Sequence, residues 1–212
     1  MCGRADLRRP CVGLAGSIPS RCVETPLTRQ ERILDRDDSV LLVIDLQESY
    51  RGKLHREDGV IAASRRMIEA AGILSIPVLV TEQYPKGLGR TRAEIAEKIP
   101  AGSAHFEKTA FSALGAPGLP ECLAELARPQ IVVIGIETHV CVNQTIHDLL
   151  VRRFQVHAVR DAITARFAAE DDIGFAKLVG SGAVPTSTEG ALFEWLRDAK
   201  APEFKAIHGL VK

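Results

Sequence analysis

The sequence predicts an α/β fold: a doubly wound, open sheet of about six mostly parallel strands with helices on both faces. Two observations support this prediction. Short runs rich in Val, Ile and Leu alternate along the chain with longer segments whose apolar residues recur at three- and four-residue spacing. The run at residues 131–136 is apolar throughout, which is typical of a parallel strand buried on both faces. Regular alternation of strand and helix favours one sheet covered by helices on both sides.

The apolar runs predict six strands, at Val40–Leu46, Ile76–Thr81, His105–Thr109, Ile131–Ile136, Gln155–Val159 and Ala183–Thr186. Helical spacing predicts helices at Val60–Leu74, Arg92–Lys98, Leu119–Leu126, Ala168–Val179 and Pro202–Leu210. It also predicts one helix that begins at Thr138 or His139 and another that ends at Asp198. Thr186 and Glu189 have capping-box spacing at the head of the helix that runs to Asp198. Asp161 is expected in the loop that follows the strand at 155–159.

The composition fits one compact domain among 212 residues, with 46% hydrophobic and 25% charged residues. Lys+Arg and Asp+Glu are balanced at 27 each, so no nucleic-acid surface is expected. No apolar run approaches the roughly 20 residues needed to span a bilayer, so no membrane association is expected. Five cysteines without a C-x-x-C pair argue against a disulfide framework and a zinc knuckle. A reducing, cytoplasmic location is expected.

The first 37 residues differ from the remainder of the chain. They hold Gly, Pro, Ser and Arg with little periodicity, and they contain Cys2, Cys11 and Cys22. We therefore expect a poorly ordered N-terminal extension at 1–37, followed by a single domain at 38–212. An Arg-rich, acid-poor start also fits a mitochondrial transit segment, although Pro10 and Pro19 would interrupt an amphipathic helix.

Three chemically reactive residues fall where predicted strands end. Asp45 lies near the end of the first strand, Lys108 ends the third, and Cys141 follows the strand at 131–136. Ligands of doubly wound sheets bind at this carboxyl edge, so the three side chains form a candidate site. Each also has an ordinary alternative: Asp45 as the cap of a loop, Lys108 as a solvated surface residue, and Cys141 as a small buried hydrophobic residue.

Cys141 is expected in the first turn of the helix that begins near Thr138. Unpaired N–H groups and the positive end of the helix dipole favour an anion there, and a thiolate is an anion. Lys108 would add a positive charge. This reasoning predicts a thiol activated as a thiolate and reactive at neutral pH.

Three motifs make the chain resemble the isochorismatase-like hydrolases, also called the cysteine hydrolase family. They are the Val43–Gln47 run, the Lys108–Ser112 segment and the Gly135–Val142 segment. The resemblance extends from about residue 39 to the C-terminus. The Val80–Gly89 loop and the Ser181–Gly190 stretch look most like the isochorismatase domain-containing proteins.

This resemblance implies an Asp–Lys–Cys catalytic triad made of Asp45, Lys108 and Cys141. It also implies a cis peptide bond between Ile136 and Glu137, with the N–H groups of Glu137 and Cys141 forming an oxyanion hole. Relatives form dimers or tetramers, so a homo-oligomer is expected. Six further residues are candidates for binding a small-molecule substrate: Gln47, Glu82, Tyr84, Phe111, Thr138 and His139. For Gln47, Glu82 and Tyr84, hydrogen bonding within a loop is equally expected. For His139, packing or hydrogen bonding at the helix start is favoured over a substrate contact.

Departures from the family narrow the expected chemistry. Nicotinamidases of the family have an Asp-x-His metal site, which the loop at 82–85 lacks, so we expect neither a metal nor a cofactor. True isochorismatases cleave a vinyl ether and lack the cysteine, so Cys141 favours acyl transfer. No arginine maps with certainty onto the carboxylate clamp of N-carbamoylsarcosine amidohydrolase.

The sequence therefore predicts a metal-independent cysteine hydrolase that cleaves an amide or a related C–N bond of a small molecule through a thioester. One alternative is a non-catalytic ligand-binding or scaffold protein with the same fold, since a triad alone does not prove turnover. A second alternative is a vinyl-ether hydrolase, which would not need the cysteine.

Overall fold

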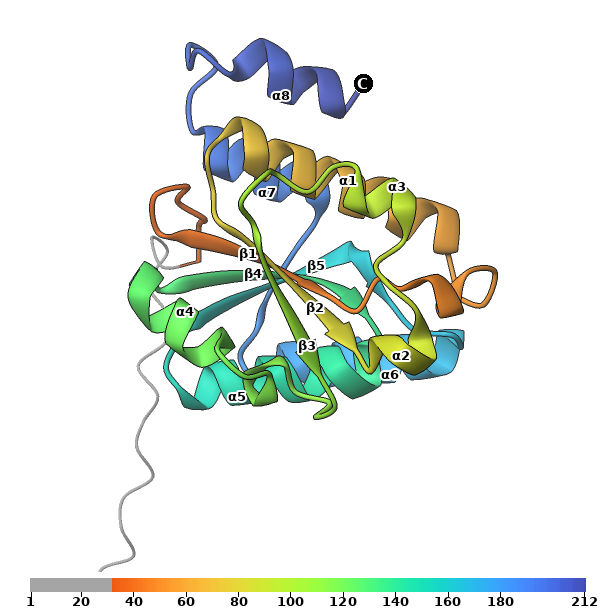
Figure 1. Ribbon diagram of the computed structural model, residues 1–212. Helices are drawn as coiled ribbons and strands as arrows, with labels where there is room; N and C mark the ends of the chain where they lie inside the picture. Colours follow the sequence, from red (N-terminus) through yellow and green to blue (C-terminus); the bar gives the residue numbers. More distant parts are fainter. Residues whose placement is uncertain (1–31) are drawn as a thin grey trace, which may run out of the picture.

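A computed structural model describes residues 32–212 and contains one six-stranded parallel sheet with the strand order β3-β2-β1-β4-β5-β6 (Figure 1). The strands are β1 Ser39–Ile44, β2 Val78–Gln83, β3 Ala104–Lys108, β4 Gln130–Ile136, β5 Gln155–Thr164 and β6 Val184–Thr186. All described pairings between neighbouring strands are parallel. The predicted doubly wound α/β fold is confirmed.

Helices cover both faces of the sheet (Figure 1). One face carries α1 Glu57–Ile73, α3 Ala93–Ala96, α7 Thr188–Leu196 and α8 Phe204–Leu210. The other carries α2 Pro85–Leu88, α4 Leu119–Leu126, α5 Asn143–Val151 and α6 Ala168–Gly180. Two 3₁₀ turns, η1 Glu48–Tyr50 and η2 Ala113–Gly115, and one π-helical turn, η3 Thr138–Val142, complete the described elements. None of the described helices is both long and apolar enough to cross a membrane.

The core forms two layers because side chains alternate between the faces of each strand. In β1, Leu41 and Val43 pack toward α1 and α7, whereas Leu42 and Ile44 pack toward α4 and α5. All six residues of β1 and all seven of β4 are buried. Burial on both faces explains why these strands appear in the sequence as continuous apolar runs.

Gly135 permits a close approach of β4 to β1 beside the predicted site. Its φ of +124° is a conformation that residues with a Cβ rarely adopt, and a Cβ at this position would collide with the carbonyl oxygen of Ile44. The register of β4 against β5 also shifts between Val133 and Gly135. The extra residues lie on β5, where Val159–Ala162 stand opposite Ile134 alone.

Three predictions about individual elements are wrong. Residues 32–37 do not belong to a poorly ordered extension, because Leu34 is fully buried and its N–H donates to Glu194 Oε2 at 2.9 Å. Asp161 lies within β5, which continues to Thr164. The cap of α7 is Ser187, whose Oγ accepts from the Gly190 N–H at 3.2 Å, and not the predicted box of Thr186 and Glu189.

Residues 1–31, which include Cys2, Cys11 and Cys22, lie outside the described part of the chain.

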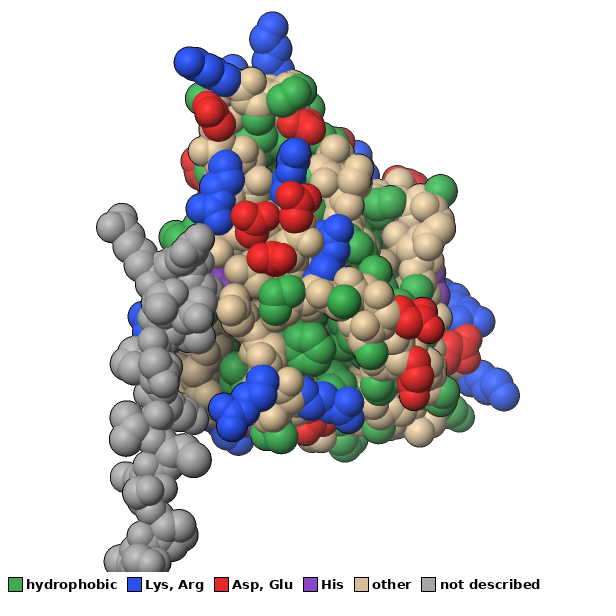
Figure 2. All heavy atoms as spheres, turned by 90° about the vertical axis from the view of Figure 1, so that its left-hand side faces the viewer, with side chains coloured by type: hydrophobic (Ala, Val, Ile, Leu, Met, Phe, Trp, Pro, Cys, Tyr) green, Lys and Arg blue, Asp and Glu red, His purple; other side chains and the backbone are tan. Residues whose placement is uncertain are grey.

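Figure 2 shows one face of the molecule, turned 90° from Figure 1, on which both basic and acidic side chains surround exposed hydrophobic ones. This mixture agrees with the balanced charge of the sequence.

Candidate active site

Asp45 lies directly beyond β1 and in a left-handed conformation, with φ of 53°. Its side chain is buried, and its two carboxylate oxygens have separate partners. Oδ1 accepts from Thr81 Oγ1 at 2.7 Å, and Oδ2 accepts from Lys108 Nζ at 2.7 Å. In the described residues no backbone N–H donates to this carboxylate, so Asp45 does not cap the following loop.

Lys108 ends β3, and its side chain is fully buried. Besides Asp45, its ammonium group donates to Gln83 Oε1 at 2.7 Å and to the Phe111 carbonyl at 3.1 Å. A buried ammonium needs such partners, because an uncompensated charge in the interior is costly. The alternative of a solvated surface lysine is therefore excluded.

Cys141 lies in the π-helical turn η3 between β4 and α5. Both Asp45 and Lys108 act on its thiol, so the three predicted catalytic side chains lie close together. Burial, followed by the negative charge of Asp45, raises the pKa of Cys141 to about 12, and the positive charge of Lys108 only partly opposes this. The expected thiolate at neutral pH is therefore corrected: the resting group is a protonated thiol, because burial outweighs the helix end and the lysine.

The backbone beside Cys141 has two features relevant to an oxyanion. The Ile136–Glu137 peptide bond is cis, as predicted. The Glu137 carbonyl accepts from the N–H groups of Val140 and Val142, at 3.0 and 3.2 Å, and the N–H of Cys141 between them takes no part in this pair.

A pocket of about 370 Å³ opens onto the Cys141 thiol. It is lined by Tyr50, Gln83, Tyr84, Leu88, Phe111, Glu137, Val140, Cys141 and Arg166. Tyr84 and Phe111, two of the predicted substrate-binding residues, are about half exposed at 54% and 52%. Burial, together with the nearby Glu137 and Cys141, raises the pKa of Tyr50, so its phenol is a proton donor at neutral pH.

Gln47 and Glu82 do not line this pocket, and their predicted role in substrate binding is corrected. Gln47 is fully buried and donates to the carbonyls of Gln83 and Gly89, at 3.0 and 2.6 Å. Glu82 accepts from the N–H and the hydroxyl of Thr91, at 2.7 and 2.8 Å. Both side chains are used to hold the loop between β2 and α3.

Thr138 and His139 are also absent from the pocket lining. Thr138 is fully buried and donates to Asp171 Oδ1 at 2.6 Å. The backbone of His139 lies against α6, where a Cβ on Gly174 would stand 3.1 Å from the His139 backbone nitrogen. The candidate role of Thr138 in substrate binding is therefore corrected to a contact behind the turn, whereas His139 has the position expected of a packing residue at the helix start.

Arg166 is a pocket residue that the sequence analysis missed. Its backbone N–H and its Nε both donate to Glu137 Oε2, at 3.0 and 2.9 Å, while neither Nη donates to any residue in the described range. The side chain is 47% exposed. Because the fifth strand was predicted to end at Val159, and not at Thr164, Arg166 was not recognised as a residue at the carboxyl edge.

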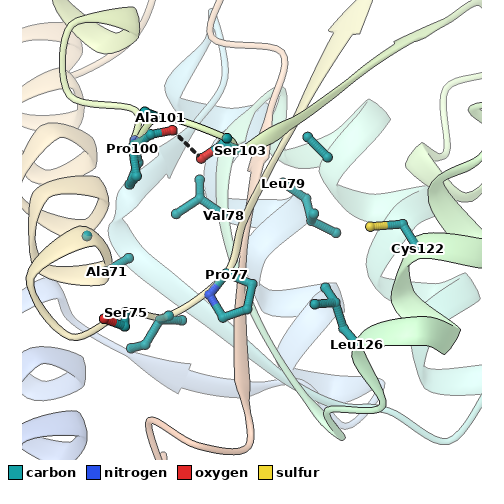
Figure 3. A pocket seen from close by; sticks show the side chains of 14 residues that line it. Ala71, Ser75, Pro77, Val78, Leu79, Pro100, Ala101, Ser103, Cys122 and Leu126 are labelled. Atoms are coloured by element: carbon teal, nitrogen blue, oxygen red, sulfur yellow. Dashed lines mark hydrogen bonds between the residues drawn. The ribbon is translucent and has the colours of Figure 1, made fainter.

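A second hollow, of about 410 Å³, lies at the amino ends of β2 and β3 (Figure 3). Small and apolar side chains line it, with Cys122 on one side and a hydrogen bond from Ser103 Oγ to the Pro100 carbonyl, 2.8 Å, on another. No charged side chain lines this hollow, so it offers no acid–base chemistry. Within residues 32–212 no three His, Cys, Asp or Glu side chains are grouped to hold a metal ion.

A parallel α/β sheet with a buried Asp–Lys pair against a cysteine at its carboxyl edge defines the isochorismatase-like, or cysteine hydrolase, class of fold. The family profile described as the isochorismatase domain matches residues 39–190, and the chain belongs to this family. The predicted family is thereby confirmed.

Relatives agree with this assignment. Isochorismatase domain-containing protein 1 of Danio rerio is 38% identical over 175 residues, which are 82% of this chain but only 61% of that protein. The chain thus spans less than two thirds of that relative. A secreted isochorismatase effector, Isc1, of Phytophthora sojae is 39% identical over 181 residues, 82% of this chain and 84% of the effector. A solved structure described as MAR1 ribonuclease from Caenorhabditis elegans is 37% identical, covers 84% of this chain and 92% of its own, and superposes with a TM-score of 0.81.

Proposed function

We propose that this protein is a metal-independent cysteine hydrolase that cleaves an amide or related C–N bond of a small molecule through a thioester acyl-enzyme. The observation that carries the proposal is the position of the Cys141 thiol beside the buried Asp45–Lys108 pair, at a pocket of about 370 Å³. A nucleophile, a base and a fixed cation in one water-poor site are the components that nucleophilic catalysis requires.

In the proposed mechanism the Asp45 carboxylate takes the thiol proton as the sulfur attacks the substrate carbonyl. A C–S bond forms, and the carbonyl oxygen becomes an oxyanion held by the N–H groups of Glu137 and Cys141. The intermediate then collapses, the C–N bond breaks, and protonated Asp45 returns its proton to the leaving amine. Water, deprotonated by Asp45, finally hydrolyses the thioester. Lys108, which donates to Asp45, compensates the negative charge that moves between Asp45 and the sulfur.

The raised pKa of Cys141 supports base-assisted attack. A thiol that is protonated at rest reacts slowly unless a base such as Asp45 takes its proton, which limits the side reactions of a free thiolate. Removal of one oxyanion-hole donor costs roughly 3 to 4 kcal/mol in enzymes of this general type, so both N–H groups would contribute strongly.

Arg166 supports a substrate with an anionic group. The Nε of its guanidinium donates to Glu137, and both Nη groups are left for a ligand. A carboxylate matches the fork geometry of a guanidinium. The aromatic side chains of Tyr84 and Phe111 add apolar surface at the mouth. We therefore propose small amides or N-carbamoyl compounds that carry a carboxylate as the substrate class.

The other candidate functions receive less support from this site. Cys141 is only 7% exposed, which suits a small molecule better than the phosphate backbone of RNA. Vinyl-ether hydrolysis would leave the thiol and its two buried partners without a role. A ligand-binding protein without turnover has the same pocket, and only an assay separates it from an enzyme.

The test is ammonia release from a panel of primary amides and N-carbamoyl acids, each paired with an analogue that lacks the carboxylate. The wild-type chain is expected to turn over at least one carboxylate-bearing member, and Cys141→Ala to lose that activity while Cys122→Ala retains it. Full activity in Cys141→Ala would contradict a cysteine mechanism. Turnover of a vinyl ether or of RNA by both variants would favour the other candidates.

We also propose that the protein self-associates. Phe167, at the start of α6, and Ile173, within it, are 63% and 68% exposed, which is unusual for large apolar side chains on a free surface. Light scattering coupled to gel filtration is expected to give a mass above that of the 23.0 kDa chain. A strictly monomeric mass at micromolar concentration would contradict this.

A further inference from the structure

A buried carboxylate lies behind the turn that carries Cys141. Asp171, in α6, is fully buried and accepts from three side chains: Thr138 Oγ1 at 2.6 Å, Arg56 Nη2 at 2.8 Å and Arg160 Nη1 at 3.0 Å. Burial by itself would raise the pKa of Asp171, but the hydrogen bonds from Thr138, Arg56 and Arg160 outweigh burial and lower it. Asp171 is therefore ionised at neutral pH and fully provided with donors.

The two arginines connect this carboxylate to the sheet. Arg56 precedes α1, and Arg160 lies where β5 departs from its register with β4. Arg56 Nη2 also donates to the Ile163 carbonyl at 3.1 Å, and Ile163 pairs with Gly135. The carboxylate is thus fixed against the end of β4, immediately before the cis peptide bond.

Thr138 is the point at which this network reaches the turn. It follows Glu137 directly and is the first residue of η3. The far end of the turn has its own anchor, because Thr145 Oγ1 donates to the Cys141 carbonyl at 2.6 Å and accepts from the Ala113 N–H at 2.8 Å. The Glu137 N–H lies one residue before the first anchor, and the Cys141 N–H belongs to the residue that the second anchor holds.

We infer that Thr138 and Asp171 form a positioning pair, which holds the Glu137 and Cys141 N–H groups in place for a substrate oxyanion although neither side chain reaches the pocket. The inference rests on the proposed function, because it assigns these N–H groups to carbonyl chemistry. A misplacement of about 1 Å at such a site typically costs on the order of 100-fold in rate. Loss of the Thr138 anchor should therefore slow attack on a carbonyl and leave the thiol itself intact.

Two probes of Cys141 separate these effects. Acylation by 4-nitrophenyl acetate passes through an oxyanion, whereas alkylation by iodoacetamide is a direct displacement that forms none. Thr138→Val preserves the shape of the side chain but removes the hydroxyl, and Thr138→Ser keeps the hydroxyl. Thr188→Val is the matched control, because Thr188 is equally buried and its hydroxyl has no partner in the described residues.

The expected result is that Thr138→Val is acylated roughly 10- to 100-fold more slowly than the wild type, with iodoacetamide alkylation changed less than twofold. Thr138→Ser and Thr188→Val should be acylated near the wild-type rate. Acylation of folded Thr138→Val at the wild-type rate would overturn the inference, as would an equal loss in both reactions. If the wild type is alkylated at Cys141 but never acylated, the proposed function fails, and the inference fails with it.

Gly174→Ala provides a second test should Thr138→Val not fold. A Cβ on Gly174 would stand 3.1 Å from Thr138 Cγ2 and from the backbone nitrogen of His139. The new methyl group therefore presses on the turn from α6 without removing a hydrogen bond. The same selective loss of acylation is expected. An unchanged ratio of acylation to alkylation would count against the positioning role.

Discussion

At the scale of single residues, the chemistry depends on how burial and charge act together on Cys141. Its thiol has an acid and a cation as neighbours, yet its pKa is raised to about 12 because desolvation is the larger effect. We predict that the iodoacetamide alkylation rate of Cys141 rises continuously from pH 7 to pH 10, since the thiolate fraction grows about tenfold per pH unit below the pKa. Peptide mapping of labelled protein measures this rate. A plateau below pH 8 would show a thiolate that the structure does not support.

Arg166 gives a second prediction at this scale. Replacing it with Met should lower kcat/KM for carboxylate-bearing amides by roughly 10- to 100-fold, because a charge-assisted hydrogen bond is worth about 1.5 to 3 kcal/mol. The kcat/KM for the matching neutral amides should change little. Arg152→Met, on an exposed arginine away from the pocket, is the control. Equal losses on charged and neutral substrates would refute a role in recognising an anion.

At the scale of elements, the site depends on the approach of β4 to β1. Gly135→Ala should lower the free energy of unfolding by about 4 kcal/mol or more, because the new methyl group collides with the Ile44 carbonyl at a positive φ. Gly59→Ala, in α1 with no atom near the new Cβ, should instead be neutral or stabilise by about 0.5 to 1 kcal/mol. Urea unfolding of both variants checks this. Wild-type stability in Gly135→Ala would contradict the close approach of the two strands.

The elements also show what could be predicted from sequence. The continuous apolar runs predicted β1 and β4, and the rule that sites form at the carboxyl edge predicted that Asp45, Lys108 and Cys141 lie together. Arg166 was not predicted as a site residue because the second half of β5 was not recognised as a strand. Polar Arg160 and Asp161 interrupt the apolar pattern there, where β5 shifts its register against β4.

Hydrogen bonds between residues that are distant in the sequence also could not be predicted from the sequence. Gln47 and Gln83 both lie near strand ends and have the same side chain, yet only Gln83 lines the pocket, because the Gln47 amide is consumed by the loop backbone. Similarly, Thr138 and Asp171 are separated by 33 residues and have no local pattern that pairs them. The protonation state of the Cys141 thiol depends on how deeply the side chain is buried, and a sequence motif does not give this burial.

At the scale of the whole molecule, His157 couples stability to pH. It is fully buried in β5, neither ring nitrogen has a partner among the described residues, and burial lowers its pKa from 6.5 to about 4. The unfolded chain therefore binds the proton first. The contribution of His157 to stability is complete above about pH 6.5 and is lost as the pH falls toward about 4, a change of about 3 kcal/mol.

His157→Leu should remove this dependence, and it should also stabilise the protein at pH 7 by about 1 kcal/mol because an unpaired polar ring leaves the core. Urea unfolding at pH 7, 5.5 and 4.5 measures both effects, with exposed His105→Gln as the control. Parallel curves of unfolding free energy against pH for His157→Leu and the wild type would refute the assignment.

The most direct test of the whole account is to trap the acyl-enzyme. The wild-type chain is mixed with 4-nitrophenyl acetate, quenched in acid within the first turnover, and analysed by intact mass and peptide mapping. We predict one acetyl group per chain, on Cys141, and none at that position in Asp45→Asn or Cys141→Ala. An unmodified Cys141, or an acetyl group only on other nucleophiles such as Cys122, would contradict the claim that Asp45, Lys108 and Cys141 form an acyl-transfer site.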